Sequence, residues 1–182
     1  EKVSGERTYL NYLFPALLVL VIMFSTLLLG TTLVMIEKHS PAFVRNFFVP
    51  VSKFTFITSI YFTNLVLIII QIFVILGISL FFMKDALGSL GVVALILFIG
   101  ASVFTFIGMV IGYMFMSEET GTLASISLGS VLLLFSGVIL PLEAVSPLIR
   151  TIAGFNPFVL TEKLVREVFL FGVPLSQNIV QL

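Results

Sequence analysis

The sequence predicts an all-α, polytopic helical membrane protein. Its mean hydropathy is +1.25, and only 10% of its 182 residues are charged, against about 25% in a typical soluble domain. The apolar residues are gathered in long uncharged runs, and a run of about 20 such residues is enough for a helix to cross a bilayer. No soluble catalytic domain fits in what remains outside these runs.

Four runs are long enough to be transmembrane helices, and they fall at about residues 12–36, 54–83, 90–116 and 119–140. Pro15 lies near the entrance of the first span, where a helix tolerates proline. Gly30 and Thr31 are small residues that predict a helix–helix contact on this span. Gly108-x-x-x-Gly112, on the third span, has a spacing that lets two helices approach closely.

The stretch Glu37–Lys53 (EKHSPAFVRNFFVPVSK) separates the first two spans and holds the only histidine of the sequence. Ser40 and Pro41 favour a helix start, because a hydroxyl caps the first turn and the missing N–H of proline costs nothing there. Pro50 limits how far the helix continues. We expect an interfacial helix over 40–50, lying in the membrane surface plane with an aromatic face. It either connects two spans only or is a platform for a cytoplasmic partner.

Ser117 comes directly before two glutamates, which suits the N-terminus of the fourth span through capping and the helix dipole. The region after that span is too short and too interrupted to be an ordinary span, because Pro141, Pro147 and Pro157 divide it. Asn156, followed by Pro157, is predicted to start a further amphipathic helix that lies at an interface. Its polar side carries two i,i+4 pairs, Glu162 with Arg166 and Lys163 with Glu167. We therefore predict a re-entrant hairpin and an amphipathic helix over 141–171.

Asn64 and Gln71 are polar amides inside the second span, and their spacing of seven places them on one helix face. Amides in lipid are costly unless paired, so this face is expected to look into the bundle. The pair serves either an interhelical hydrogen bond or the lining of a translocation path. The absence of cysteine and the single histidine argue against a thiolate- or histidine-based metal site. The zero net charge offers no basic surface for nucleic acid.

Two segments together resemble the membrane permeases of type-2 ABC exporters, which move drugs, lipids or lipid-linked polysaccharides. In that family a cytoplasmic segment after the second helix carries a glutamate, a basic residue, an arginine and a proline, which here are Glu37, Lys38, Arg45 and Pro50. His39 replaces a second glutamate, and Pro41 stands with Ala42 where Gly-Thr is usual. A second family segment corresponds to Ser136, Gly137, Val138, Pro141, Pro147, Asn156, Pro157 and Arg166. Such permeases usually have six spans, and this chain resembles spans two to five with the extracytoplasmic hairpin.

The resemblance implies a mechanism for the chain. Such permeases form homo- or heterodimers and bind two ATP-binding cassette subunits. Coupling to those subunits would involve Glu37, Lys38, Ser40, Pro41, Arg45 and Pro50, and substrate would leave past the hairpin that starts at Ser136. The sequence carries no G-x-x-x-x-G-K-[ST] phosphate loop. ATP and Mg²⁺ would therefore be bound by the partner subunit, with no cofactor and no catalytic residue in this chain.

The same resemblance implies a multi-pass protein of the cell membrane. Residues 37–53 and 117–120 would face the cytoplasm, and residues 1–9, 84–88 and 142–182 would lie outside. A plain count of basic residues favours the reverse orientation. We follow the resemblance, because a preceding span can dominate insertion.

Two other classes are compatible with a bundle of apolar helices. A gradient-driven secondary transporter usually has ionisable residues at mid-membrane, and the four predicted spans carry none there. A non-transporting membrane scaffold would explain the glycines and serines by packing alone, but not the two family segments occurring together. An intramembrane enzyme would need a Ser/His, Asp/Asp or metal-ligand set, which the predicted spans lack.

Overall fold

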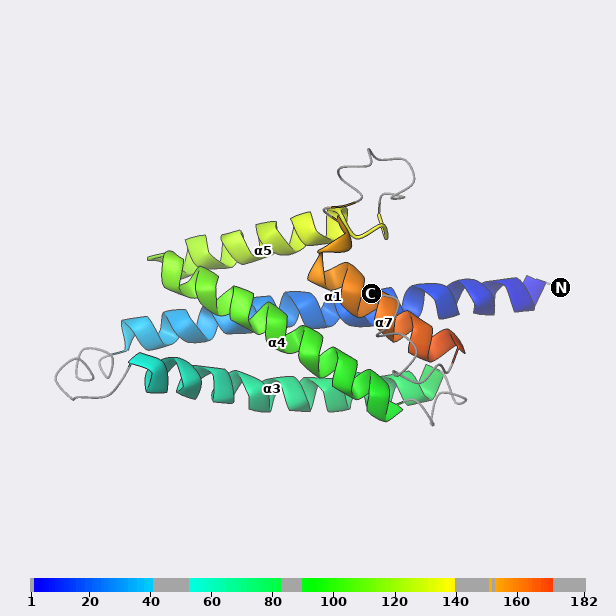
Figure 1. Cartoon of the computed structure of the whole chain (residues 1–182), viewed down its shortest axis with the longest axis horizontal. Helices are drawn as coiled ribbons and strands as arrows, with labels where there is room; N and C mark the ends of the chain where they lie inside the picture. Colours follow the sequence, from blue (N-terminus) through cyan, green and yellow to red (C-terminus); the bar gives the residue numbers. More distant parts are fainter. Residues whose placement is uncertain (1, 41–52, 83–89, 140–150, 152, 172–182) are drawn as a thin grey trace.

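The protein is a bundle of long helices in the computed structural model, which describes residues 2–40, 53–82, 90–139, 151 and 153–171. The helices are, in order, α1 (Lys2–His39), α3 (Lys53–Phe82), α4 (Leu90–Met114), α5 (Glu118–Leu134) and α7 (Pro157–Phe171). The first four run along the long axis of the bundle, and α7 packs on α1 and α4 in the half that holds the N-terminus (Figure 1). The described ranges contain no strand, so the predicted all-α membrane fold is confirmed.

Within the described ranges, three helices are long and apolar enough to cross a membrane: Leu13–His39, Ile57–Ile78 and Leu90–Met114. The helix α5 has 17 residues, slightly fewer than the about 20 that a crossing normally takes. It ends at Leu134, earlier than the predicted limit of the fourth span, because the chain turns at Phe135 and reaches a positive φ of 79° at Gly137. A crossing by α5 therefore stays a prediction.

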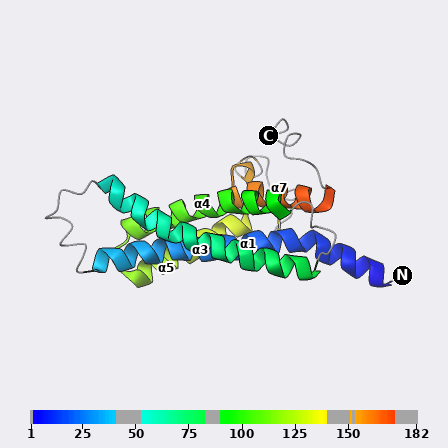
Figure 2. The ribbon, with the colours of Figure 1, turned by 90° about the horizontal axis from the view of Figure 1, so that it is seen from below.

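Proline 15 does not lie at a helix entrance, as the hydrophobic run suggested, but inside α1. Because α1 begins at Lys2, Pro15 interrupts the backbone hydrogen bonding in the middle of a continuous helix. The prediction was wrong for a physical reason: an apolar run marks where lipid begins, whereas the charged residues before it continue the helix without difficulty. The first turns of α1 extend past the rest of the bundle (Figures 1 and 2).

The closest contact in the bundle joins α1 to α4 through glycines. A Cβ added at Gly108 would lie 2.3 Å from the Leu27 carbonyl oxygen, and one at Gly30 would lie 2.6 Å from the Thr105 carbonyl oxygen. A Cβ at Gly112 would also lie closer than normal contact to atoms of α1. The two backbones therefore touch directly, which only glycine permits at these positions. The predicted close approach through Gly30 and the Gly108-x-x-x-Gly112 spacing is confirmed.

The helix α5 packs on α1 through a second stripe of small residues. Gly121, Ser125 and Gly129, four apart, are the buried residues of this helix. The Ser125 hydroxyl lies 2.6 Å from the Thr31 hydroxyl, and Thr31 Oγ1 lies 2.9 Å from the Gly108 carbonyl oxygen of α4. This polar cluster is fully buried and joins α1, α4 and α5 at one point.

The helix α3 packs on α1 and α4 through a narrower surface than the one that joins α1 to α4. Figure 2 shows it crossing the outer side of α1. Its buried residues form a single row, Ile60, Asn64, Ile68, Ile72 and Ile75. Large apolar side chains such as Phe62 and Phe73 are mostly exposed on the rest of the helix. A surface of this kind suits lipid or a further helix, since neither requires polar groups there.

Candidate functional site

Lysine 38, in the last turn of α1, does not point away from the bundle. Its Nζ donates to the Phe115 carbonyl at 2.7 Å, to the Gly112 carbonyl at 3.1 Å and to the Tyr113 carbonyl at 3.4 Å. All three acceptors lie at or just after the C-terminus of α4. Lys38 therefore joins the end of α1 to the turn between α4 and α5.

This contact gives the C-terminus of α4 both hydrogen-bond donors and a positive charge. The last carbonyls of a helix have no partner within the helix, and the helix dipole places partial negative charge there. The last turn of α4 contains no basic residue of its own. The ammonium group of Lys38 supplies three donors and a positive charge in one position, and hydrogen bonds from charged groups contribute about 1.5–3 kcal/mol.

The other predicted coupling residues divide into two groups. Glu37 and Ser40 are half-buried at the end of α1, and the Ser40 N–H donates to the Glu37 carbonyl at 3.1 Å. Pro41, Arg45 and Pro50, with most of the predicted 40–50 helix, lie outside the described residues. The structure thus places Glu37, Lys38 and Ser40 together at the end of the bundle where the α4–α5 turn also lies (Figure 1).

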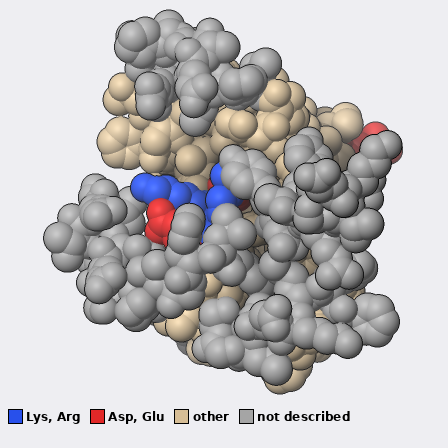
Figure 3. All heavy atoms as spheres, turned by 90° about the vertical axis from the view of Figure 1, so that its right-hand side faces the viewer, with Lys and Arg blue, Asp and Glu red and all other residues tan. Residues whose placement is uncertain are grey.

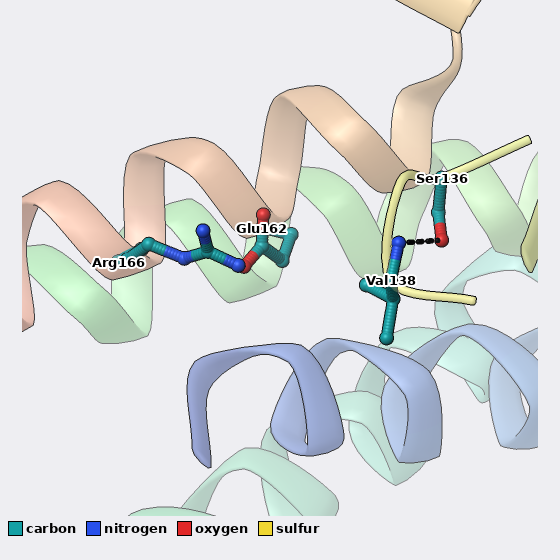
Figure 4. Close-up of polar contacts among 4 residues, drawn as sticks. All are labelled: Ser136, Val138, Glu162 and Arg166. Atoms are coloured by element: carbon teal, nitrogen blue, oxygen red, sulfur yellow. Dashed lines mark hydrogen bonds and ion pairs between the residues drawn. The ribbon is translucent and has the colours of Figure 1, made fainter. Parts of the chain in front are cut away.

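At the opposite end, Ser136 and Gly137 form a turn after α5 (Figure 4). The Ser136 hydroxyl donates to the Leu133 carbonyl at 2.6 Å and accepts the Val138 N–H at 3.1 Å. It therefore adds a second hydrogen bond to the Leu133 carbonyl, which also accepts the Ser136 N–H at 3.1 Å, and it gives the Val138 amide an acceptor in the turn. Gly137 then takes the left-handed conformation, with φ 79°, which other residues adopt only with strain.

Asparagine 156 caps two helices at once. Its Oδ1 accepts the Phe158 N–H at 2.9 Å, which confirms the predicted N-cap of α7. Its Nδ2 donates to the Leu132 carbonyl at 2.7 Å, near the C-terminus of α5. Pro157 is the first residue of α7, where a missing N–H costs nothing. One side chain therefore holds the end of α5 against the start of α7, whereas Pro141 and Pro147 lie outside the described residues.

The predicted pair of Glu162 and Arg166 on α7 is confirmed as an ion pair (Figure 4). Its placement on a polar, exposed side was wrong, because Glu162 is only 6% exposed. The helix packs on α1 and α4 and does not only lie at a membrane interface. A Cβ added at Gly100 of α4 would lie 2.8 Å from the Thr161 side chain. Burial raises the pKa of the Glu162 carboxyl, and Arg166 opposes this shift in part.

Charged side chains gather on the face of the bundle seen from the N-terminal end of α1 (Figure 3). Among the side chains that the structure describes, those with charge at this end all belong to α7: Glu162, Lys163, Arg166 and Glu167. Lys163 is exposed, and Glu167 is half-buried. The α7 helix thus presents both signs of charge next to the Ser136 turn.

Asn64 and Gln71 both face inward but are not brought together. Asn64 is 1% exposed, and its Nδ2 donates to the Ile60 carbonyl of its own helix at 3.2 Å. The Nε2 of Gln71 donates to the Ser25 hydroxyl of α1. Gln71 thus makes a hydrogen bond between two helices, which is the packing role considered for this face.

The sequence pattern did not reveal two of these contacts. Nothing in the sequence joins Lys38 to the C-terminus of α4, and the family resemblance placed it in a segment that couples to a partner subunit. The only hint was that the last turn of α4 has no basic residue. Nothing paired Thr31 with Ser125 either, because hydroxyls 94 residues apart in the sequence carry no common pattern.

Together, the long apolar helices, the close glycine contacts and the buried hydrogen bonds between helices define a helical membrane protein. A family model described as ABC-2 family transporter protein matches residues 3–182, and the chain therefore belongs to this family. No curated protein and no solved structure matched the chain. Members of the family are the membrane components of ABC transporters and pair with ATP-binding cassette subunits. The chain is a permease subunit of that kind.

Proposed function

We propose that this permease exports its substrate with energy from ATP that a partner subunit binds, with Mg²⁺, and hydrolyses. The match of the ABC-2 transporter family over residues 3–182 is the observation that carries the proposal. The sequence contains no phosphate-binding loop of the G-x-x-x-x-G-K-[ST] type, so the nucleotide falls to the partner. The permease acts as a homo- or heterodimer in the cell membrane, which it crosses several times.

The contact with the ATPase subunit involves the end of α1 and the residues that follow it, Glu37 to Pro50. One feature of the bundle supports this assignment. The two turns expected in the cytoplasm, one after α1 and one between α4 and α5, lie at the same end, where Lys38 Nζ is 2.7 Å from the Phe115 carbonyl oxygen. A single subunit can therefore meet both turns from one side of the membrane.

The exit lies at the other end of the bundle, past the hairpin that starts at Ser136. Asn156 holds the end of α5 beside the start of α7, and the Ser136 hydroxyl stabilises the turn that follows α5. These contacts, on the two sides of the predicted hairpin, support its assignment to the extracytoplasmic mouth. The following helix, α7, packs on α1 and α4, and Glu162 and Arg166 form an ion pair within it.

The proposal is tested by purifying the full-length protein in mild detergent from its own cells and measuring ATPase activity per mole of permease. We expect an ATPase subunit to purify with it in fixed ratio. The combined change Glu37→Lys and Arg45→Glu is expected to weaken the contact at least about tenfold, which corresponds to about 1.4 kcal/mol. Lys163→Glu reverses an exposed charge on α7, at the opposite end of the bundle, and is the matched control.

Size-exclusion chromatography of each variant shows whether the permease is still folded. A folded double variant that keeps its ATPase in full would contradict the assignment of Glu37–Pro50 to coupling. A wild-type protein that purifies intact without any ATPase would contradict ATP-driven transport itself.

A further inference from the structure

The ties between α1, α4 and α5 extend along much of the bundle. At one end Lys38 binds carbonyls of α4 and of the turn that follows it. Further along, Thr31 meets Gly108 of α4 and Ser125 of α5. Between these points the α1 and α4 backbones are in direct contact. A shift of α1 along either neighbour would break buried polar contacts and separate touching backbones.

The described contacts of helix α3 with its neighbours are made through side chains. Gln71 donates to the Ser25 hydroxyl of α1, and Tyr61 donates to the Ser102 hydroxyl of α4. A Cβ added at Gly77 would meet nothing within 4 Å, so this glycine makes no close helix contact. Side-chain contacts of this sort adapt by rotamer changes when a helix moves, whereas backbone contacts cannot.

The segment expected to receive the push from the ATPase lies between α1 and α3, because it follows His39 and precedes Lys53. A push there acts on the ends of both helices. Near the α3 end, Tyr61 contacts α4 through its side chain, bonding to Ser102 and stacking on Phe106. The α1 end is held to the α4–α5 turn by Lys38. Its ammonium group donates to the Gly112 carbonyl in the last turn of α4 and to the Phe115 carbonyl just after it.

We propose that Lys38 is a positioning residue that fastens the end of α1 to the α4–α5 turn, so that α1, α4 and α5 move as one body relative to α3. The proposal rests on the proposed function, because it assumes that nucleotide binding by the partner moves this end of the bundle. It gives Lys38 a role within the permease, in addition to its place in the segment that is proposed to meet the ATPase.

The test uses spin-label distances in the full transporter with its ATPase subunit. The 182 residues contain no cysteine, so pairs of cysteines can be introduced for labelling and no native thiol among these residues has to be removed first. The first pair, Ile36→Cys with Met116→Cys, lies on α1 and the α4–α5 turn. The second pair, Phe54→Cys with Met116→Cys, spans from α3 to the same turn. All three positions are exposed, at 55%, 84% and 78% for Ile36, Met116 and Phe54.

Distances are measured without nucleotide and with Mg-ATP trapped by vanadate. In the otherwise wild-type protein, the Ile36–Met116 distance is expected to stay constant, while the Phe54–Met116 distance shifts by about 2 Å or more, the size of helix shifts in switching proteins. Lys38→Met keeps the apolar stem and removes the ammonium group. With this change the Ile36–Met116 distance is expected to shift with nucleotide as well.

Two variants control for other causes. Lys38→Arg keeps a cationic donor and is expected to restore the constant distance. Ser130→Ala removes an α5 hydroxyl that donates to the Ile126 carbonyl of its own helix at 2.8 Å, and it is expected to behave as wild type. A purely structural role for Lys38 would change thermal stability without making the distance depend on nucleotide.

Three results would overturn the proposal. If the Ile36–Met116 distance shifts with nucleotide in the wild type, Lys38 does not hold the two parts together. If that distance stays constant in Lys38→Met, Lys38 is not needed for it. In both cases only the role of Lys38 is refuted. If neither distance responds while the complex hydrolyses ATP, nucleotide does not move this end, and the proposed coupling fails together with the inference. If Lys38→Met does not fold, the wild-type pair still decides, because the fastening requires its distance to be constant.

Discussion

Replacing Gly108 by alanine tests the close contact of α1 and α4 most directly. The new Cβ would lie 2.3 Å from the Leu27 carbonyl oxygen and 3.1 Å from the Leu27 Cα. Ordinary contact begins near 3.4 Å, so the helices would have to separate by about 1 Å. The obstacle is backbone and cannot turn away, unlike the end of a flexible side chain.

The expected magnitude follows from two opposing effects. Overpacking of this kind costs about 1–3 kcal/mol, whereas alanine in place of glycine within a helix gains about 0.5–1 kcal/mol. The separation also loosens the contact of Gly30 with Thr105, because it lies in the same interface. We therefore expect Gly108→Ala to lower the free energy of unfolding by about 1–2 kcal/mol.

The assay is unfolding in detergent, followed by the helical circular dichroism signal. Gly77→Ala is the matched control, because it makes the same change in a helix where a Cβ meets nothing within 4 Å. It is expected to leave stability unchanged or to raise it by up to about 1 kcal/mol. If Gly108→Ala is as stable as Gly77→Ala, the reasoning from close backbone contact is refuted.

Two further predictions concern the opposite end of the bundle. Gly137→Leu places a side chain at φ 79° and is expected to cost about 1–2 kcal/mol and to lower the amount of folded protein in the membrane. Gly154→Leu, in open space without a positive φ, is the control; normal amounts of folded Gly137→Leu would contradict the turn. Burial raises the pKa of Glu162 above its usual 4.5, so the folded protein holds this proton more tightly than the unfolded chain. The free energy of unfolding is therefore expected to fall as the pH rises from about 4.5 through the raised pKa, and Glu162→Gln is expected to remove this slope. Parallel pH profiles for the two proteins would show that Glu162 is not the group responsible.

Local features of the fold were predictable because their causes lie within a few residues. Ser117 accepts the Thr120 N–H and caps α5, and Asn156 accepts the Phe158 N–H and caps α7. Both follow from a short polar side chain placed just before a helical run. The small residues Gly30, Gly108 and Gly112 predicted close contact in the same way, although not which helix each would meet.

The candidate site was predicted less completely, because the meaning of a charged residue depends on its surroundings. The family resemblance placed Lys38 among the residues that couple to an ATPase subunit, and it did not indicate that its ammonium group binds carbonyls at the end of α4. Glu162 was expected on a polar surface, and it is buried beside Arg166. Neither outcome is encoded in the spacing of charges along one helix.

The sequence by itself determined the class of protein, the main helices and their caps, because hydrophobicity and short-range hydrogen bonding are local properties. It also carried the two segments that resemble type-2 ABC permeases. The tertiary structure alone decided the partners of Lys38, Thr31 and Asn156. Lys38 and Phe115 are 77 residues apart along the chain, and only the packing of α1 against α4 brings a helix end with unpaired carbonyls within reach of that ammonium group.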